Sequence, residues 1–483
     1  MMYRGRFKVA LYFPLFLLLS SLTIGVVYAQ LIDWEHTWGI DAEDYSTGIA
    51  VTSHYVYLSG RGLNSLGYPV ATLMKFDEDG NLIWDRIWSY GVESEAADVA
   101  VDQKGDVYLV GRGKTSAKTY YAFIAKFDSS GDLLWDRIIE DALGSAVAVD
   151  NLGNVYLVGY PTASVDVFIA KFDSSGSLLW ARSWGTAGGY EYPGDAVIDS
   201  AGNIYVTGWT NGFGLGDYHA FVTKFDPSGN PLWTIIWQAG TRDYGRGLAI
   251  KGEYIYAAFK TYTNDYAAVV AKFDRYGNLI WDRSWDGSAD DRCEGITVGS
   301  SDMVFLTGWT KSFGAGGEDV FIAAFTLSGK LLWDMVWGGT DDDEARAIAA
   351  DATSIYVTGS TRTSNHYSSD PNAVVADPVA SITSLSTTTT YLTISALDPN
   401  AVSSDPDATL DDVSGIDAFI LRIRLQAPVG GEVLSSPRRI YDDIFGVLMS
   451  VIIIFLLTLA AIKCLTKESQ RNLPKPTSRA SIL

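Results

Sequence analysis

The chain of 483 residues has only 2 cysteines and 14 prolines, and its 36 lysine and arginine residues face 57 aspartate and glutamate residues. So few cysteines in a chain of this length exclude a domain held together by disulfides. The formal net charge of -21 disfavours nucleic-acid binding, because phosphates need a basic surface. Charged residues are also scarce, at 19% against 47% apolar residues, which argues against intrinsic disorder. The 47 glycines and 13% aromatic residues instead favour β-structure.

The N-terminus has the pattern of a secretory signal peptide. Arg4, Arg6 and Lys8 precede a long apolar run, which ends in small residues at Ala29. We expect residues 1–29 to be a signal peptide that is cleaved after Ala29. An uncleaved membrane anchor is the alternative, because the apolar run is long enough to span a bilayer.

A second apolar run, residues 444–462, carries no charge. At about 1.5 Å per helical residue it extends roughly 29 Å, which matches the hydrocarbon core of a bilayer. Residues 463–483 carry five lysine and arginine residues against one glutamate, and positive charge favours the cytoplasmic side. We therefore expect a juxtamembrane linker at 427–443, a single transmembrane helix at 444–462 and a cytoplasmic tail at 463–483. The rest of the chain would lie outside the cell, anchored in the cell membrane.

Two phrases recur along the chain with a period near 50 residues, which is the size of a four-stranded propeller blade. The first runs from Lys-Phe-Asp through Gly to Trp, at residues 75–84, 126–135, 171–180, 224–233 and 272–281, with a degenerate copy at 324–333. The second has the form Val-Ala-Val-Asp-x-x-Gly-Asn-x-Tyr-Val-x-Gly and occurs seven times. Each Asp-x-x-Gly predicts a tight turn. The unit therefore reads as four short strands, A to D, joined A–B and C–D by tight turns and B–C and D–A by longer loops.

The first strand of the mature chain completes the ring. Residues 418–425 resemble a seventh strand C, and nothing after them resembles a strand D. Residues 31–38 match strand D, and Trp34 stands in phase with Trp84. Residues 30–426 are therefore predicted to form an all-β, seven-bladed β-propeller of four-stranded antiparallel blades. In this ring, residues 31–38 close blade 7 and leave no open edge.

Blade 7 contains an insertion at residues 364–415, which is rich in Ser, Thr and Asp. A connection of about 50 residues far exceeds normal loops, so the insertion is either disordered or a small appended element. Residues 374–379 and 391–396 have strand-like composition, which suggests a hairpin.

The recurring phrases resemble the SBBP-type beta-propeller repeat family of exported bacterial and archaeal proteins. The best matches are Asp-Ser-Ala-Gly-Asn-Ile-Tyr-Val-Thr-Gly at residues 199–208 and Phe-Val-Thr-Lys-Phe-Asp-Pro-Ser-Gly at residues 221–229. The resemblance covers about residues 31–425 apart from the insertion. It implies a propeller on an exported protein and implies no particular activity.

The longer loops all emerge on one face, where acidic and aromatic residues gather. Near the axis, three neighbouring blades have Arg246, Glu294 and Arg346 at the position where the other four have small residues. This cluster predicts an asymmetric ligand pocket at the channel mouth, and a structural ion pair is the alternative. The candidate ligand-binding residues are Arg246, Glu294, Arg346, Asp290, Asp291, Trp209 and Trp309.

The acidic run Asp341, Asp342, Asp343 and Glu344 is a candidate Ca2+ site, because hard cations take carboxylate oxygens from several residues. A solvated acidic loop is the alternative. The recurring Trp of each unit could be exposed for sugar binding, but its apolar neighbours favour packing between blades.

The sequence therefore favours a membrane-anchored cell-surface propeller that serves as a binding or adhesion scaffold through its acidic, aromatic loop face. A surface glycan or a protein is the expected partner, and no nucleic acid. No catalytic residue is assigned, because the chain has no nucleophile motif, HExxH or Walker loop. The alternatives are an extracellular hydrolase or quinoprotein-like enzyme with its site at the channel mouth, and a purely structural envelope component.

Overall fold

The computed structural model describes residues 32–38, 44–362, 366–369, 374–376, 381–385, 390–391, 396–397, 402–404 and 416–425. All of them belong to one compact unit, Met1–Ala427. The predicted signal peptide, linker, transmembrane helix and cytoplasmic tail lie outside the described residues. Within those residues, no helix is long and apolar enough to cross a membrane.

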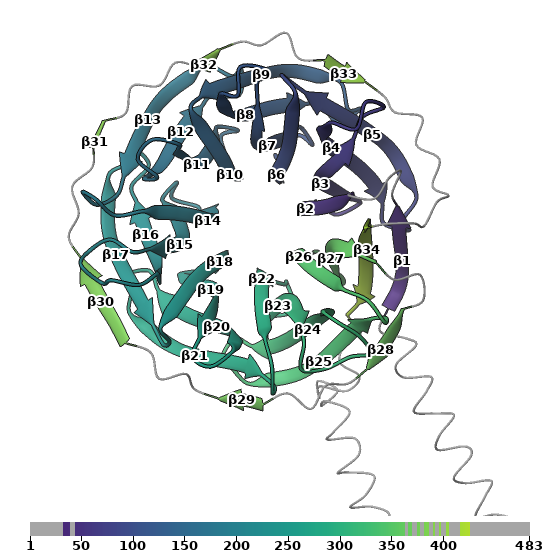
Figure 1. Ribbon diagram of the computed structural model, residues 1–483, viewed down its shortest axis with the longest axis vertical. Helices are drawn as coiled ribbons and strands as arrows, with labels where there is room; N and C mark the ends of the chain where they lie inside the picture. The colour runs from purple at the N-terminus through teal and green to yellow at the C-terminus, as the bar shows by residue number, and fades with distance from the viewer. Residues whose placement is uncertain are drawn as a thin grey trace, which may run out of the picture. The chain divides into compact units, whose positions relative to one another are not determined.

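The strands form seven antiparallel sheets, which are arranged as blades around an axis (Figure 1). Counted outward from the axis, blade 1 has β2 (Tyr45–Val51), β3 (Tyr55–Leu63), β4 (Pro69–Asp77) and β5 (Leu82–Ser89); blade 2 has β6 (Glu93–Val101), β7 (Val107–Lys114), β8 (Tyr120–Phe127) and β9 (Leu133–Glu140). Blade 3 has β10 (Ala142–Val149), β11 (Val155–Pro161), β12 (Val167–Phe172) and β13 (Leu178–Trp184); blade 4 has β14 (Glu191–Ile198), β15 (Ile204–Thr210), β16 (His219–Phe225) and β17 (Pro231–Gln238). Blade 5 has β18 (Arg242–Lys251), β19 (Tyr254–Tyr262), β20 (Tyr266–Asp274) and β21 (Leu279–Asp286); blade 6 has β22 (Asp291–Val298), β23 (Met303–Thr310), β24 (Asp319–Thr326) and β25 (Leu331–Gly338).

Blade 7 is assembled from both ends of the described chain. Its strands, from the axis outward, are β26 (Asp343–Ala350), β27 (Ser354–Thr361), β34 (Asp417–Arg424) and β1 (Ile32–Trp38). β1 pairs antiparallel with β34, with Trp34 opposite Arg422. The predicted seven four-stranded antiparallel blades are therefore present, and the N-terminal strand is the outer strand of the last one.

The tight turns follow from the Asp-x-x-Gly phrase. In blade 2, one carboxylate oxygen of Asp128 accepts hydrogen bonds from the backbone N–H groups of Ser130 and Asp132, at 2.8 and 3.0 Å. Gly131 has a φ of 85°, which a residue without Cβ adopts at little cost. These turns lie together on one face, the turn face, and the longer connections lie on the opposite face, the loop face.

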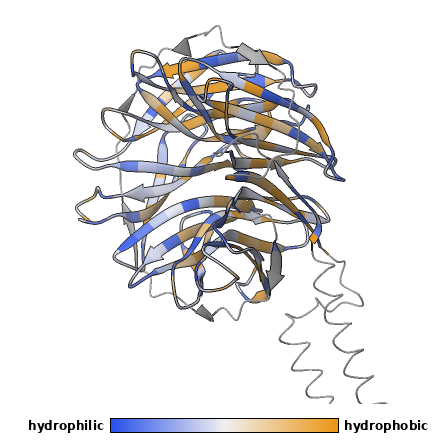
Figure 2. Cartoon of the chain, turned by 45° about the vertical axis from the view of Figure 1, so that its right-hand side comes forward, coloured by the Kyte–Doolittle hydropathy of each residue, from blue (hydrophilic) through white to orange (hydrophobic). Residues whose placement is uncertain are grey.

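The core is distributed between the blades rather than gathered in one layer. The described residues form seven hydrophobic clusters, most of them shared by neighbouring blades. Figure 2 shows the corresponding hydrophobic segments spread over all the blades. Strands that are packed on both sides need apolar residues on both faces, as in β8 and β16.

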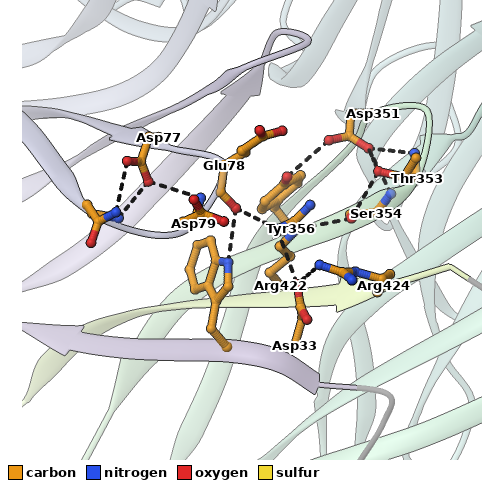
Figure 3. A network of polar contacts seen from close by, with 12 residues as sticks. Asp33, Asp77, Glu78, Asp79, Asp351, Thr353, Ser354, Tyr356, Arg422 and Arg424 are labelled. Carbon is orange, nitrogen blue, oxygen red and sulfur yellow. Dashed lines mark hydrogen bonds and ion pairs between the residues drawn. The ribbon is translucent and has the colours of Figure 1, made fainter.

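The recurring Trp residues join each blade to the next, as the apolar context predicted. Trp84 Nε1 and Lys75 Nζ of blade 1 both donate to the carbonyl oxygen of Ser129 in a turn of blade 2, at 3.3 and 2.9 Å. Equivalent Trp and Lys side chains donate to Ser174 O and to Leu327 O. Between blades 7 and 1, Arg422 takes the place of the lysine and, with Trp34, donates to Glu78 O (Figure 3).

The insertion in blade 7 forms a belt around the outside of the propeller. Its strands are β28 (Tyr367–Ser369), β29 (Val374–Ala376), β30 (Ser381–Leu385), β31 (Thr390–Tyr391), β32 (Ala396–Leu397) and β33 (Val402–Ser404). In this order they pair antiparallel with the outer strands of blades 6, 5, 4, 3, 2 and 1 (Figure 1, light green at the rim).

The expected hairpin within the insertion is therefore wrong. β29 pairs with β21 of blade 5 and β31 pairs with β13 of blade 3, so the two strand-like segments do not pair with each other. The physical reason is that the outer strand of each blade presents unpaired backbone N–H and C=O groups along its free edge. A short extended segment satisfies those groups without needing a hydrophobic pattern of its own.

Candidate functional site

A β-bulge in every innermost strand directs one residue toward the axis. In β18 the pairing register shifts between Gly245 and Gly247, which leaves Arg246 as the extra residue. A bulge bends the strand and re-aims this side chain. The other six inner strands have the same shift at Thr47, Ala97, Ser145, Gly194, Glu294 and Arg346. All seven residues line one axial cavity of about 700 Å³.

The charged side of this ring contains an ion cluster. Arg246 donates through Nε and Nη2 to one carboxylate oxygen of Glu294, and Lys260 Nζ lies 3.7 Å from the other. Burial opposes the ionisation of Glu294, but Arg246 and Lys260 outweigh it, so the pKa of Glu294 is below its usual value. Burial, together with Arg246, lowers the pKa of Lys260 to about 8. Arg346 does not join this pair, and its Nη2 lies 3.3 Å from Glu344.

Four aromatic side chains, Tyr45, Tyr160, Tyr192 and Trp209, also line the cavity. Trp209 lines the cavity and stacks on Tyr192, with ring centroids 5.3 Å apart and planes at 17°. On the other side, Tyr45 donates through its hydroxyl to Glu95 at 2.6 Å, and Arg112 lies 3.5 Å from the same carboxylate. The sequence analysis did not assign Tyr45, Glu95, Arg112 or Tyr192 to the site. The available signal was the period-two alternation of strands, because Tyr45, Glu95 and Tyr192 each precede the bulged residue by two positions.

Three of the predicted site residues lie outside the wall of the axial cavity. Asp290 forms an ion pair with Arg292 at 2.9 Å. Asp291 is fully buried and accepts hydrogen bonds from the Gly287 N–H and the Ser312 hydroxyl, both at 2.7 Å. Trp309 has the Arg292 guanidinium 4.5 Å from its ring centroid. Arg246, Glu294, Arg346 and Trp209 do share the cavity, whereas Asp290, Asp291 and Trp309 do not.

The side chains of the acidic run in blade 7 make separate contacts within the described structure. Asp343 is buried and accepts from the Gly339 N–H at 2.7 Å, while Asp342 forms an ion pair with Arg362 at 2.7 Å. Glu344 faces Arg346 instead. Across the described part of the chain, no three His, Cys, Asp or Glu side chains are grouped in a way that could hold a metal ion. The Ca2+ site expected at Asp341 to Glu344 stays a prediction.

Several acidic residues on the loop face hold the loops in place. Glu191, Asp243, Asp291 and Asp343 occupy related positions near the start of an inner strand, and each accepts from a backbone amide of the loop before it. Each also accepts from a threonine at the end of the second strand of its blade. Burial raises the pKa values of Glu191, Asp243 and Asp291. These carboxyl groups give the loop face a fixed shape.

Two further carboxyl groups join blades at the axis itself. Asp98 accepts from its neighbour Val99 N and from Val147 N of blade 3, at 2.8 and 2.9 Å. Asp195 likewise bridges blades 4 and 5 through Leu248 N at 2.8 Å. Burial raises the pKa of Asp98 to about 8 and that of Asp195 to about 6. The sequence distinguishes Asp98 and Asp195, because each directly follows the bulged residue, at a position where the other blades have Gly or Ala.

Comparison with family models gives one match. Residues 186–214 match the model described as SBBP, beta-propeller repeat, which confirms the resemblance stated from the repeated phrases. A comparison with curated proteins finds no match.

Solved structures with a similar fold have little sequence in common with the chain. The structure of the Dos1 propeller is 10% identical, with a TM-score of 0.43, over 67% of this chain and 93% of that one. The phage phi92 endosialidase is 11% identical, with a TM-score of 0.46, over 83% and 71%. The polysaccharide lyase Uly1 is 9% identical, with a TM-score of 0.47, over 82% and 100%.

Proposed function

We propose that the chain is a membrane-anchored propeller of the cell surface, which binds a surface glycan or a protein through its loop face. The observation that supports this proposal is the axial cavity of about 700 Å³. Its size lies within the range of ligand sites, and its wall combines flat aromatic surfaces with a few converging charged groups. Such a wall is suited to a sugar or to a side chain of a partner protein.

The direction of the last strand is compatible with this function. β34 runs from the loop face to the turn face, where the Leu425 N–H donates to Thr353 O in the turn before β27. The segment that follows β34 therefore starts at the face opposite the loops. The covalent connection to an anchor at residues 444–462 would therefore leave the propeller at the turn face.

The loop face also has the rigidity that a preformed site requires. The buried carboxyl groups of Glu191, Asp243, Asp291 and Asp343 each fix a loop by accepting hydrogen bonds from its backbone and from a threonine. Loops that are already ordered lose little conformational entropy when a ligand binds.

The membrane topology can be tested with the two cysteines of the chain. Cys293 is buried, so an impermeant maleimide should react only with Cys464 next to the predicted span. We expect Cys464 to be protected in intact cells and labelled after lysis. Leu66 is 77% exposed on the loop face, so a Leu66→Cys variant should be labelled in intact cells. Labelling of Cys464 in intact cells would contradict the proposed orientation.

Ligand binding is tested with the full chain in lipid nanodiscs, on an array of cell-envelope glycans and against candidate surface proteins. We expect a ligand whose affinity falls at least tenfold in Trp209→Leu, because this change removes the stacking surface of the cavity. Tyr276→Ser is the matched control, because Tyr276 is an exposed aromatic residue on the turn face. Equal losses in the two variants would contradict a site on the loop face. Conversion of the ligand to product would favour the extracellular enzyme instead.

A further inference from the structure

Two arginines of the cavity, one in blade 7 and one in blade 2, have more N–H donors than the described protein acceptors occupy. Arg346 meets one protein acceptor among the described residues, Glu344 at 3.3 Å, and Arg112 meets one, Glu95 at 3.5 Å. Both distances exceed the 2.7–2.9 Å that is typical of charged hydrogen bonds. Arg246 differs, because two of its nitrogens donate to Glu294. The guanidinium groups of Arg346 and Arg112 are therefore still able to bind a ligand.

Tyr45 connects these two arginines. Its ring centroid lies 4.8 Å from Cζ of Arg346, and its hydroxyl donates at 2.6 Å to Glu95, the carboxylate next to Arg112. Burial and the neighbouring Glu95 raise the pKa of Tyr45 to about 12, so the phenol stays neutral. Arg346, Tyr45 and Arg112 come from three consecutive blades and line the same cavity.

The carboxyl groups of this region are already engaged. Glu294 is paired with Arg246 and Lys260, and Glu95 accepts from Tyr45 and faces Arg112. Asp98 and Asp195 each accept two backbone N–H groups. The arginine donors on the cavity wall therefore favour a ligand group that accepts hydrogen bonds and carries negative charge, although the protein as a whole is acidic. A guanidinium group matches two oxygens of a carboxylate or a sulfate.

We propose that Arg346, Tyr45 and Arg112 form an oxyanion subsite of the axial cavity, and that this subsite receives the carboxylate or sulfate group of an acidic sugar. The stacked pair Trp209 and Tyr192, in blade 4 on the other side of the same cavity, supplies a flat surface for the sugar ring. This inference rests on the proposed binding function and specifies the chemical class of its ligand.

The test compares three probes with the full chain in nanodiscs: trigalacturonate, a galactose oligosaccharide carrying sulfate, and neutral galactotriose of matched length. Isothermal titration calorimetry should show at least tenfold tighter binding of an acidic probe than of the neutral one. Tighter binding of trigalacturonate assigns the subsite to a carboxylate, and tighter binding of the sulfated probe assigns it to a sulfate. Raising the salt concentration should lower the affinity for the acidic probe more than the affinity for the neutral probe, because the arginines bind the acidic group electrostatically.

Variants then locate the subsite. Arg346→Met should lower the affinity for the acidic probe at least tenfold and leave the neutral probe unchanged, and Arg112→Met should act in the same direction. Arg346→Lys should retain only part of the affinity, because lysine keeps the positive charge but lacks the two parallel N–H donors of the guanidinium group. Arg362→Met is the matched control, because Arg362 is a loop-face arginine paired with Asp342 outside the cavity wall. Thermal unfolding of each variant checks the fold.

The failures of the two proposals can be told apart. Equal affinity for the acidic and neutral probes, or an unchanged acidic affinity in Arg346→Met, would overturn the oxyanion subsite and leave the binding function in place. Binding of a protein partner alone, with no affinity for any acidic probe, would also overturn the subsite. Absence of any glycan or protein ligand would overturn the proposed function as well.

Discussion

Replacement of Arg422 by methionine tests how the ring is held closed. Nη1 of Arg422 donates to Glu78 O of blade 1 at 2.6 Å and lies 3.2 Å from Asp33 of β1, and Nε donates to the Ser354 hydroxyl at 3.0 Å (Figure 3). The residue is only 6% exposed. Methionine keeps most of the aliphatic length and removes all three contacts, so the change probes the polar links alone.

The expected cost follows from these contacts. Removal of one partner from a buried ion pair costs about 3–5 kcal/mol. Asp33 keeps Arg424 at 2.9 Å and is partly exposed, so the lower end of about 3 kcal/mol applies. For a propeller of about 390 residues the unfolding entropy is about 0.8 kcal/mol per kelvin, which converts this cost to a fall in Tm of about 4 °C.

The assay is urea denaturation together with hydrogen exchange of the β1 amides, with β14 of blade 4 as the internal reference. We expect a lower midpoint and faster exchange in β1, because β1 is joined to the ring through blade 7. Arg424→Met is the control two residues along the same strand, since the Arg424 side chain is 58% exposed and, among the described residues, forms its ion pair with Asp33, for an expected loss below about 1 kcal/mol. Equal effects of the two substitutions, or unchanged exchange in β1, would refute the closure argument.

Three further predictions concern the axis, the belt and the links between blades. Burial raises the pKa of Asp98 from 3.8 to about 8, so its contribution to stability is full below about pH 4 and is lost as the pH rises through 8. The Asp98→Asn variant should therefore lose about 5 kcal/mol less stability than the unmodified protein between pH 4 and pH 8, measured by urea denaturation, and an identical pH profile would contradict the buried proton. Replacement of residues 363–415 by a short Gly/Ser loop should leave a folded propeller that self-associates in light scattering, because six outer edges lose their cover, and a monomer would show that these edges are protected in another way. Lys224→Met should cost less than about 1 kcal/mol, because the ion pair of Lys224 with Asp199, its only one among the described residues, is 3.9 Å long. Lys75→Met loses the 2.9 Å hydrogen bond to Ser129 O and should cost about 2 kcal/mol, and the reverse order of the two denaturation midpoints would contradict the role of that bond.

The repeated phrases were enough to predict the blades and part of the site. Phase alone located the seven axial positions, because equivalent residues of a repeat occupy equivalent places, and Arg246 and Glu294 do meet there. Phase could not say that Arg346 faces Glu344 instead, because such a choice depends on side-chain directions across blades. It also could not show that Asp343 supports a loop, because the sequence does not reveal which backbone amide its carboxylate accepts from.

The belt was not predictable from hydrophobic pattern. Its strands have two to five residues, too few for alternation to be seen, and their pairing depends on edges that are distant in sequence. One signal was nevertheless present. Asp-Pro occurs four times in the insertion, and the copies at residues 370–371, 377–378 and 398–399 each begin four residues before a strand, namely β29, β30 and β33. This repeat within the insertion is typical of a segment that makes the same contact with one blade after another.

The belt limits how this molecule can have changed in size. A propeller changes size by whole blades, because each sequence repeat forms one blade. Here each of six sheets has a matching short segment elsewhere in the chain, and those segments begin six to nine residues apart. An added blade would need a second insertion in the belt that supplies one more short strand. Without it, the belt strands that follow would each pair with the wrong blade. Two distant coding regions would have to lengthen together, so the arrangement favours a constant count of units over long descent.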